Sequence, residues 1–122
     1  MKTVLLIEDD AAIRENTCEL LELKGFQVIS AVNGKEGLAL AEENKPDIIL
    51  CDIMMPEADG YQVFTELKNN NETSSIPFIF LTASVEKKEV EKAFGMGVHG
   101  YIRKPFDTDE LFNAIENCLN KK

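Results

Sequence analysis

The sequence contains no tryptophan, one histidine and three cysteines, and it has no apolar run long enough to cross a lipid bilayer. The spacing of Cys18, Cys51 and Cys118 matches neither a zinc site nor a disulfide framework, so we interpret them as reduced thiols that pack as small apolar side chains. Reduced thiols favour a cytoplasmic location. The N-terminus opens on a short strand-like run instead of the basic and apolar regions of a signal peptide, which agrees with that location.

Basic residues are also scarce. The chain has 13 Lys and Arg residues against 22 Asp and Glu residues, which gives a net charge of −9. Such a charge repels phosphate backbones and anionic lipid headgroups, so we expect neither nucleic acid nor membrane as a direct partner. A cation bound at one acidic site fits this charge better.

The apolar residues gather in five short runs rich in β-branched and aromatic side chains, as expected for strands covered on both faces of a parallel sheet. The runs are Val4–Ile7, Phe26–Ala31, Ile48–Cys51, Phe78–Leu81 and Val98–Ile102. A chain of 122 residues, 44% of them hydrophobic, has the size of one domain, so we expect residues 1–122 to form a single compact fold.

Helical periodicity alternates with these runs, and capping residues mark the helix ends. The expected capping residues are Gly25 at the end of the first helix and, at the starts of later helices, Asn33 with Glu36, Asp59, Ser84, and Asp107 with Glu110. Five alternations of strand and helix predict an α/β fold, with helices on both faces of a doubly wound, five-stranded parallel sheet. The G-x-G-x-x-G pattern at 95–100 follows a helix and precedes a strand, the reverse of a dinucleotide-binding motif, so we interpret it as coincidental.

In open α/β sheets, ligands bind beyond the carboxyl ends of the strands. Those positions carry acids, a hydroxyl and one amine, namely Glu8, Asp9, Asp10, Asp52, Thr82 and Lys104. Mg²⁺ prefers hard oxygen ligands and relieves the repulsion between neighbouring carboxylates. The pattern therefore predicts a magnesium site that Asp9 and Asp52 bind directly and Glu8 binds directly or through water. Asp10 either belongs to this site or only caps the first helix.

Four motifs follow one another along the chain. They are Ile7-Glu8-Asp9-Asp10; Leu50-Cys51-Asp52-Ile53-Met54-Met55-Pro56 followed by Asp59-Gly60; Leu81-Thr82-Ala83; and Gly100-Tyr101-Ile102-Arg103-Lys104-Pro105-Phe106. Together they resemble the receiver domain of two-component response regulators, in particular its single-domain, chemotaxis-regulator-like members. The resemblance extends over the whole chain and implies a flavodoxin-like sheet with strand order 2-1-3-4-5.

The resemblance also implies a role for each matching residue. The roles are phosphoacceptor for Asp52; Mg²⁺ ligand for Glu8, Asp9, Asp52 and the backbone oxygen of Met54; phosphoryl binding for Thr82, Ala83 and Lys104; conformational switching for Thr82 and Tyr101; and a cis peptide bond before Pro105. Tyr101 also has a plain alternative, which is packing in the core.

By the same resemblance, the phosphoryl group comes from a sensor histidine kinase or a histidine phosphotransfer protein that docks on the first helix and the loop after the fifth strand. The signal then passes to a downstream protein or a fused output domain. The last helix, 110–122, has no arginine, which weakens the case for the salt-bridged dimers of receivers fused to DNA-binding domains. The chain ends directly after that helix, so a stand-alone regulator and a receiver cut from a longer protein both stay open, with the first favoured.

A switch of this kind is not an enzyme in the usual sense, because it catalyses only its own phosphorylation and dephosphorylation. Two other function classes stay open. One is a phosphorylation-independent binding module on the same fold. The other is a small Mg²⁺-dependent phosphatase with an aspartate nucleophile, which is disfavoured because Met54 stands where haloacid dehalogenase-like enzymes carry an acid–base aspartate. We expect structural roles for His99, and for Cys51 because strand alternation turns it away from Asp52.

Overall fold

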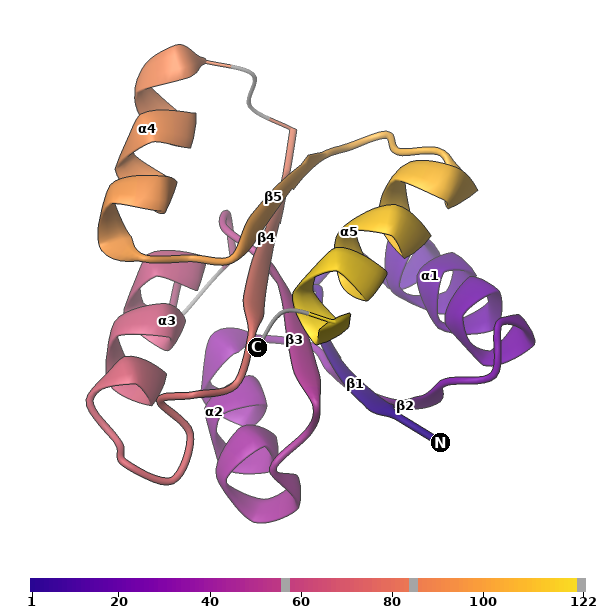
Figure 1. Ribbon diagram of the computed structural model, residues 1–122, viewed down its shortest axis with the longest axis horizontal. Coiled ribbons are helices and arrows are strands. Elements are labelled where there is room, and N and C mark those ends of the chain that lie inside the picture. Colours follow the sequence, from indigo (N-terminus) through magenta and orange to yellow (C-terminus); the bar gives the residue numbers. More distant parts are fainter. Residues whose placement is uncertain (56–57, 84–85, 121–122) are drawn as a thin grey trace.

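The computed structural model describes residues 1–55, 58–83 and 86–120. Strands and helices alternate along the chain, as expected (Figure 1). The strands are β1 (Thr3–Ile7), β2 (Gln27–Ala31), β3 (Ile48–Asp52), β4 (Phe78–Thr82) and β5 (Gly100–Arg103). The helices are α1 (Ala11–Leu23), α2 (Gly34–Asn44), α3 (Gly60–Lys68), α4 (Lys87–Met96) and α5 (Thr108–Asn120). Each strand boundary lies within two residues of its expected run.

The five strands form one parallel sheet in the order β2-β1-β3-β4-β5, which confirms the predicted fold class and strand order. In Figure 1, α2, α3 and α4 lie on one side of the sheet, and α1 and α5 lie on the other. The chain turns from β1 outward to β2 and then returns past β1 to β3. The strand order therefore reverses between β1 and β3, which is where open α/β sheets bind ligands.

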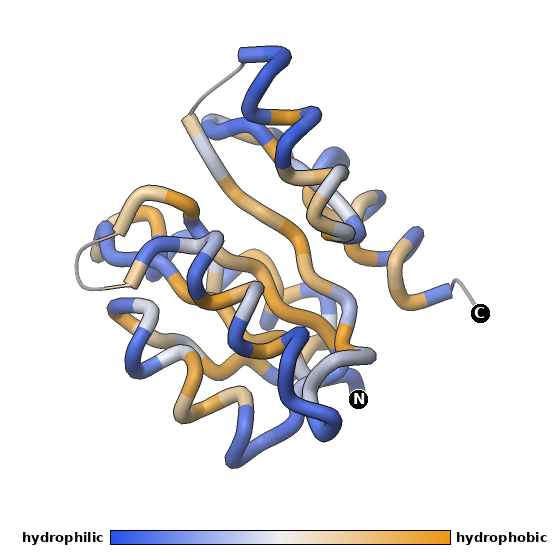
Figure 2. Tube along the Cα trace, turned by 90° about the vertical axis from the view of Figure 1, so that its left-hand side faces the viewer, coloured by the Kyte–Doolittle hydropathy of each residue, from blue (hydrophilic) through white to orange (hydrophobic). Residues whose placement is uncertain are grey.

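Two apolar layers hold the helices to the sheet, as the orange central segments of Figure 2 indicate. The layer under α2, α3 and α4 contains the aromatic residues Phe64, Phe78 and Phe80, whose rings meet edge to face. The layer under α1 and α5 is aliphatic and includes the fully buried Leu21 and Leu111. Because both faces are covered, β3 and β4 are buried along their whole length, and this explains their continuous apolar runs.

Most of the predicted helix caps are confirmed. The side chains of Asn33, Asp59 and Asp107 each accept a hydrogen bond from the backbone N–H three residues later, at 2.8 to 2.9 Å. Helix α1 ends at Leu23 with Lys24 as its C-cap, and Gly25 follows with a φ of +100° that suits glycine and an N–H that donates to the Glu22 carbonyl. Ser84 lies outside the described residues, and the N-cap position of α4 is Glu86.

The structure agrees with the structural roles expected for His99 and Cys51. The Nδ1 atom of His99 accepts a hydrogen bond from the backbone N–H of Phe78 at 3.1 Å and so satisfies the first N–H group of β4. Cys51 and Cys118 are buried, and neither they nor the partly buried Cys18 form a disulfide. The glycine pattern at 95–100 begins inside α4 and ends at the first residue of β5, so it lacks the strand–helix context of nucleotide binding. Among the helices that the structure describes, none has the length and apolarity to span a membrane.

Candidate functional site

The strand register brings the candidate residues to one edge of the sheet. Ile7 pairs with Cys51, and Asp52 pairs with Leu81 on the next strand. The residues that follow β1 and end β3 therefore emerge side by side at the point where strand order reverses. Thr82 ends β4 at the same edge, and Lys104 directly follows β5. The predicted cluster is thus a consequence of register in a parallel sheet.

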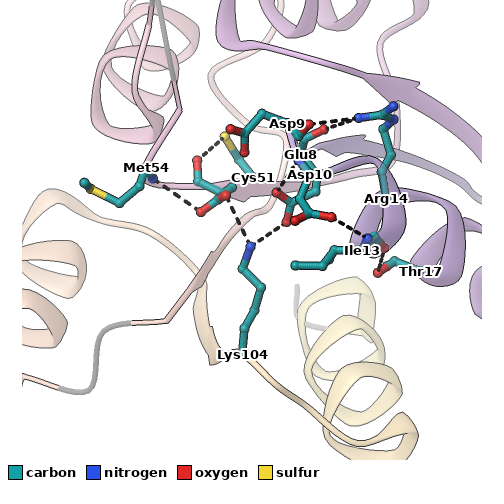
Figure 3. A network of polar contacts seen from close by, with 10 residues as sticks. Glu8, Asp9, Asp10, Ile13, Arg14, Thr17, Cys51, Met54 and Lys104 are labelled. Carbon is teal, nitrogen blue, oxygen red and sulfur yellow. Dashed lines mark hydrogen bonds and ion pairs between the residues drawn. The ribbon is translucent and has the colours of Figure 1, made fainter.

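Lys104 is the centre of this cluster (Figure 3). Its Nζ atom lies 2.6 Å from Oε1 of Glu8 and 3.2 Å from Oδ2 of Asp52. Burial disfavours the charged ammonium, but the hydrogen bond with Glu8 and the charges of Asp52 and Glu8 outweigh it and raise the pKa of Lys104 above its usual value. Lys104 is therefore a fixed cation beside the Asp52 carboxylate. The peptide bond between Lys104 and Pro105 is cis, as the family resemblance implies.

Glu8 is fully buried, which is unusual for a carboxylate. Desolvation raises its pKa to about 7; the hydrogen bond from Lys104 opposes this rise, and the neighbouring Asp52 adds to it. A backbone N–H, that of Asp10, also donates to Glu8 at 3.2 Å. Near neutral pH, this carboxyl group is therefore close to the point at which it gains or loses a proton.

The donor set fits a magnesium ion. Glu8, Asp9 and Asp52 each offer one carboxylate oxygen, and within the described part of the chain these three oxygens lie within 4.8 Å of one another. Mg²⁺ takes hard oxygen ligands and usually keeps several waters, so three carboxylates around a partly open site suit it. Asp10 has the other role that the sequence left open, because its side chain accepts the Ile13 N–H at 3.0 Å and caps α1.

The backbone at Met54 lies close to the Asp52 carboxylate, since the Met54 N–H donates to Oδ1 of Asp52 at 3.3 Å. The Met54 side chain is 76% exposed and stands at the edge of the site (Figure 3). This placement leaves the backbone of Met54, and not its thioether, next to the acids. The ligand role expected for the carbonyl oxygen of Met54 stays a prediction.

A cavity of about 540 Å³ opens beside Asp52. Thr82, Ala83 and Lys104 line it together with Asp52, so the structure brings together all the residues expected to bind a phosphoryl group. Thr82 is buried, and its carbonyl accepts the Lys104 N–H at 2.7 Å, which ties the end of β4 to the segment that carries the lysine. Tyr101, on β5, is partly buried and packs against Phe94 of α4 with 6.5 Å between ring centroids.

Two residues position the site in ways that the sequence did not reveal: Arg14 was not singled out, and Gly60 was part of a motif without a role of its own. The guanidinium of Arg14 donates to the carbonyl of Glu8 at 2.9 Å and to that of Asp9 at 3.4 Å, and it so holds the acidic turn (Figure 3). At Gly60, a Cβ atom would lie 2.7 Å from the Asp52 carbonyl, so only glycine lets α3 start this close to β3. The position of Gly60 after a capping Asp was a usable signal, whereas nothing in the sequence marks Arg14.

Comparison with known proteins agrees with this geometry. The family model described as response regulator receiver domain matches residues 4–116, which is most of the chain. The chain belongs to this family of receiver domains. The recognition made from the four sequence motifs is therefore confirmed.

Relatives and solved structures place the receiver among signalling proteins. It is 42% identical over 116 residues to the probable transcriptional regulator ycf29 of Pyropia yezoensis, of which it covers 52%. It is 36% identical over 121 residues to protein PilH of Pseudomonas aeruginosa and covers 98% of that protein. The chain thus spans about half the length of several curated relatives and nearly all of another.

The fold of the receiver matches that of solved relatives closely. Chemotaxis protein CheY4 of Vibrio cholerae superposes with a TM-score of 0.92 at 26% identity, over 98% of this chain and 99% of the other. The receiver domain of sensor histidine kinase PA1611 from Pseudomonas aeruginosa superposes with a TM-score of 0.91 at 27% identity, over 98% of both chains. That second structure carries a magnesium ion coordinated in its active site cleft.

Proposed function

We propose that this receiver is a phosphorylation-dependent switch in a two-component or phosphorelay system, and that Asp52 accepts the phosphoryl group. One observation carries the proposal: the Lys104 ammonium lies 3.2 Å from the Asp52 carboxylate, and oxygens of Glu8, Asp9 and Asp52 lie within 4.8 Å of one another. A carboxylate nucleophile needs this combination of a nearby cation and a place for a metal, because phosphoryl transfer depends mainly on positioning and charge neutralisation.

Residues of the chain supply the nucleophile, one cation and the hydrogen-bond donors for phosphoryl transfer. An oxygen of Asp52 forms a bond to phosphorus while the P–N bond of a donor phosphohistidine breaks, and the imidazole keeps the electron pair and takes up a proton. Lys104 neutralises charge on the phosphoryl oxygens, and the Thr82 hydroxyl and the Ala83 N–H supply hydrogen-bond donors. Glu8, Asp9, Asp52 and the Met54 carbonyl hold Mg²⁺, which when bound contributes a further positive charge at the phosphoryl oxygens.

The same geometry supports docking of a phosphodonor protein. An apolar cavity of about 470 Å³ lies between α1 and the segment after β5, lined by residues that include Ile13, Leu20, Pro105 and Phe106. It adjoins the phosphoacceptor cavity, because Ala83 and Lys104 line both. We assign this surface to a sensor histidine kinase or a histidine phosphotransfer protein, working in the cytoplasm. With a net charge of −9, the receiver then signals to a downstream protein or a fused output domain and not to nucleic acid directly.

Phosphorylation changes the face formed by α4, β5 and α5 in this proposal. The phosphoryl group adds about −1.5 to −2 of charge next to Thr82. Thr82 then moves toward the new acceptor oxygens, and Tyr101 turns inward and leaves Phe94, which is already 50% exposed. This is a shift of population between two packings of one fold.

Labelling with acetyl phosphate tests the proposal. Intact-protein mass should rise by one phosphoryl group in the presence of Mg²⁺ and stay unchanged with a chelator. The amount of acetate released should stop near one equivalent on the time scale of labelling, since a switch holds its phosphoryl group. A phosphatase would release many equivalents without a stable mass increase, and a binding module would show Mg²⁺ binding with neither mass change nor beryllofluoride binding.

A further inference from the structure

The cavity beside Asp52 extends past the proposed phosphorylation site to a wall formed by α3 and α4, where three side chains contact one another. The hydroxyl of Tyr61 donates a hydrogen bond to Oε2 of Glu89 at 2.6 Å. The Nζ atom of Lys92 lies 4.1 Å from the centroid of the Tyr61 ring, within cation–π range. Tyr61 belongs to the first turn of α3, and Glu89 and Lys92 lie one turn apart on α4. All three side chains line the same cavity as Asp52.

Tyr61 is anchored on the side of the phosphoacceptor. Its ring meets that of Phe80 edge to face at 5.2 Å, and Phe80 lies two residues before Thr82 on β4. Gly60, the residue before Tyr61, starts α3 so close to β3 that a Cβ atom there would lie 2.7 Å from the Asp52 carbonyl, and its N–H donates to the Ile53 carbonyl at 2.9 Å. Desolvation and the hydrogen bond to Glu89 raise the pKa of Tyr61, so its hydroxyl stays protonated and remains a donor.

Helix α4 has much less to hold it. The structure describes α4 over its whole length, and Ala93 is its one buried residue, whereas α3 buries Gly60, Val63, Phe64 and Leu67. With so little apolar burial, α4 belongs to the segments of lowest local stability. The contacts of Glu89 and Lys92 with Tyr61 therefore make a large contribution to where α4 sits.

Charge makes these contacts sensitive to phosphorylation. The wall already places Asp59, Glu86 and Glu89 around the cavity. An aspartyl phosphate at Asp52 adds about −1.5 to −2 of charge to the same space. Like charges that line one cavity repel, and the hydrogen bond from Tyr61 holds Glu89 toward the cavity. Phosphorylation thus penalises the position of Glu89 seen here.

The geometry points to a latch: Tyr61, Glu89 and Lys92 hold α4 in its unphosphorylated position, and the latch opens when Asp52 carries a phosphoryl group. This inference rests on the proposed function and adds a control element to it. Lys92 partly offsets the charge of Glu89 while the latch is closed. A closed latch makes phosphorylation less favourable, because the phosphoryl group must also open it.

The free-energy cost of opening the latch can be measured as a change in affinity for beryllofluoride, a phosphoryl mimic, by calorimetry in the presence of Mg²⁺. Tyr61→Phe keeps the ring on Phe80 and removes only the hydroxyl, so it should raise beryllofluoride affinity by about 3- to 10-fold, the range expected for one partly exposed hydrogen bond to a charged group. Glu89→Ala should raise it similarly, and the double variant should show no more than the larger single effect, because both substitutions break the same contact. Glu91→Ala removes the same charge from the same helix outside the cavity and serves as the control.

A second measurement keeps the latch and the proposed function separate. Hydrogen–deuterium exchange of the α4 amides, without any phosphoryl mimic, should be several-fold faster in Tyr61→Phe than in the wild type and unchanged in Glu91→Ala. Equal exchange in Tyr61→Phe and wild type would overturn the latch, as would additive effects of Tyr61→Phe and Glu89→Ala on beryllofluoride affinity. A wild-type protein that binds no beryllofluoride would count against the proposed function, and the exchange result would still decide the latch.

Discussion

The two ends of the sheet use polar side chains in different ways. At the amino ends of the strands, Asp47 accepts the Thr3 N–H at 2.7 Å and His99 accepts the Phe78 N–H at 3.1 Å. Each of these two side chains has a backbone partner. At the carboxyl ends, Glu8 and Asp52 are buried next to one another, and one ammonium group serves both.

The arrangement at the carboxyl ends of the strands lowers the stability of the fold in exchange for reactivity. Backbone partners satisfy a side chain at little cost, and they tie loops to strands. Neighbouring buried carboxylates repel, and burial, with a further contribution from Asp52, raises the pKa of Glu8. An arrangement that stabilises the fold so poorly is expected where the fold must bind a cation and carry out a reaction.

The comparison is sharpest at Asp52. Asp52→Asn keeps the shape of the side chain and removes the nucleophilic carboxylate, so labelling by acetyl phosphate should fall by at least about 100-fold, the scale of losing a covalent nucleophile. The same substitution removes one negative charge from a repelling pair, so the thermal midpoint without Mg²⁺ should not fall. Undiminished labelling of Asp52→Asn would move the reaction to another residue.

Lys104 should separate chemistry from signalling. Lys104→Ala removes the cation that bridges the β5 side of the site to Asp52. We expect the variant to accept a phosphoryl group more slowly, by roughly 10-fold or more, and to lose the conformational response, since the phosphoryl group no longer pulls on the segment after β5. Amide chemical shifts of α4 and β5 with and without beryllofluoride check this, and a response of wild-type size would contradict it.

A matched change at the amino ends should have the reverse profile. Asp47→Ala removes the acceptor of the Thr3 N–H and should cost about 1 kcal/mol of unfolding free energy, the typical net value of such a hydrogen bond. Labelling by acetyl phosphate should stay within about 2-fold of wild type, because Asp47 is far along the strand from the site. Urea unfolding gives the first quantity and intact mass the second. A large loss of labelling in Asp47→Ala would contradict the claim that the amino ends of the strands serve stability and not the reaction.

Glu8 gives an effect with a defined pH window. Its pKa in the folded protein, about 7, lies above the unfolded value of 4.5. Between these values the folded state binds more protons than the unfolded state, so the contribution of Glu8 to stability falls as pH rises from about 4.5 to 7. Without Mg²⁺, the thermal midpoint of Glu8→Gln should therefore rise relative to that of the wild type by roughly 5 to 10 °C between pH 5 and pH 7.5. A difference that stays constant over this range would contradict the raised pKa.

Much of this could be predicted from the sequence, because the signals are local. The continuous runs of β3 and β4 reflect burial on both faces, and the caps at Asn33, Asp59 and Asp107 need only residues three positions apart. The grouping of Glu8, Asp52 and Lys104 followed from their places at strand ends. The strand order came from the family resemblance, since alternation of strand and helix alone is compatible with several orders.

The rest depended on contacts between distant segments. The hydrogen bond between Tyr61 and Glu89 joins residues 28 positions apart on the surfaces of two helices, and neither residue stands in a recognisable pattern. The hydrogen bonds from Arg14 to the carbonyls of Glu8 and Asp9 depend on the exact position and direction of the start of α1. The raised pKa of Glu8 depends on complete burial of one side chain, which composition and periodicity do not specify.

The most direct test of the central claim is to locate the phosphoryl group. The receiver is labelled with acetyl phosphate and Mg²⁺, reduced with borohydride, which converts an aspartyl phosphate to homoserine, and digested for peptide mass spectrometry. We expect homoserine at position 52 alone, and none when Mg²⁺ is removed by a chelator. Homoserine at another acidic residue such as Asp9, or equal labelling without Mg²⁺, would contradict it.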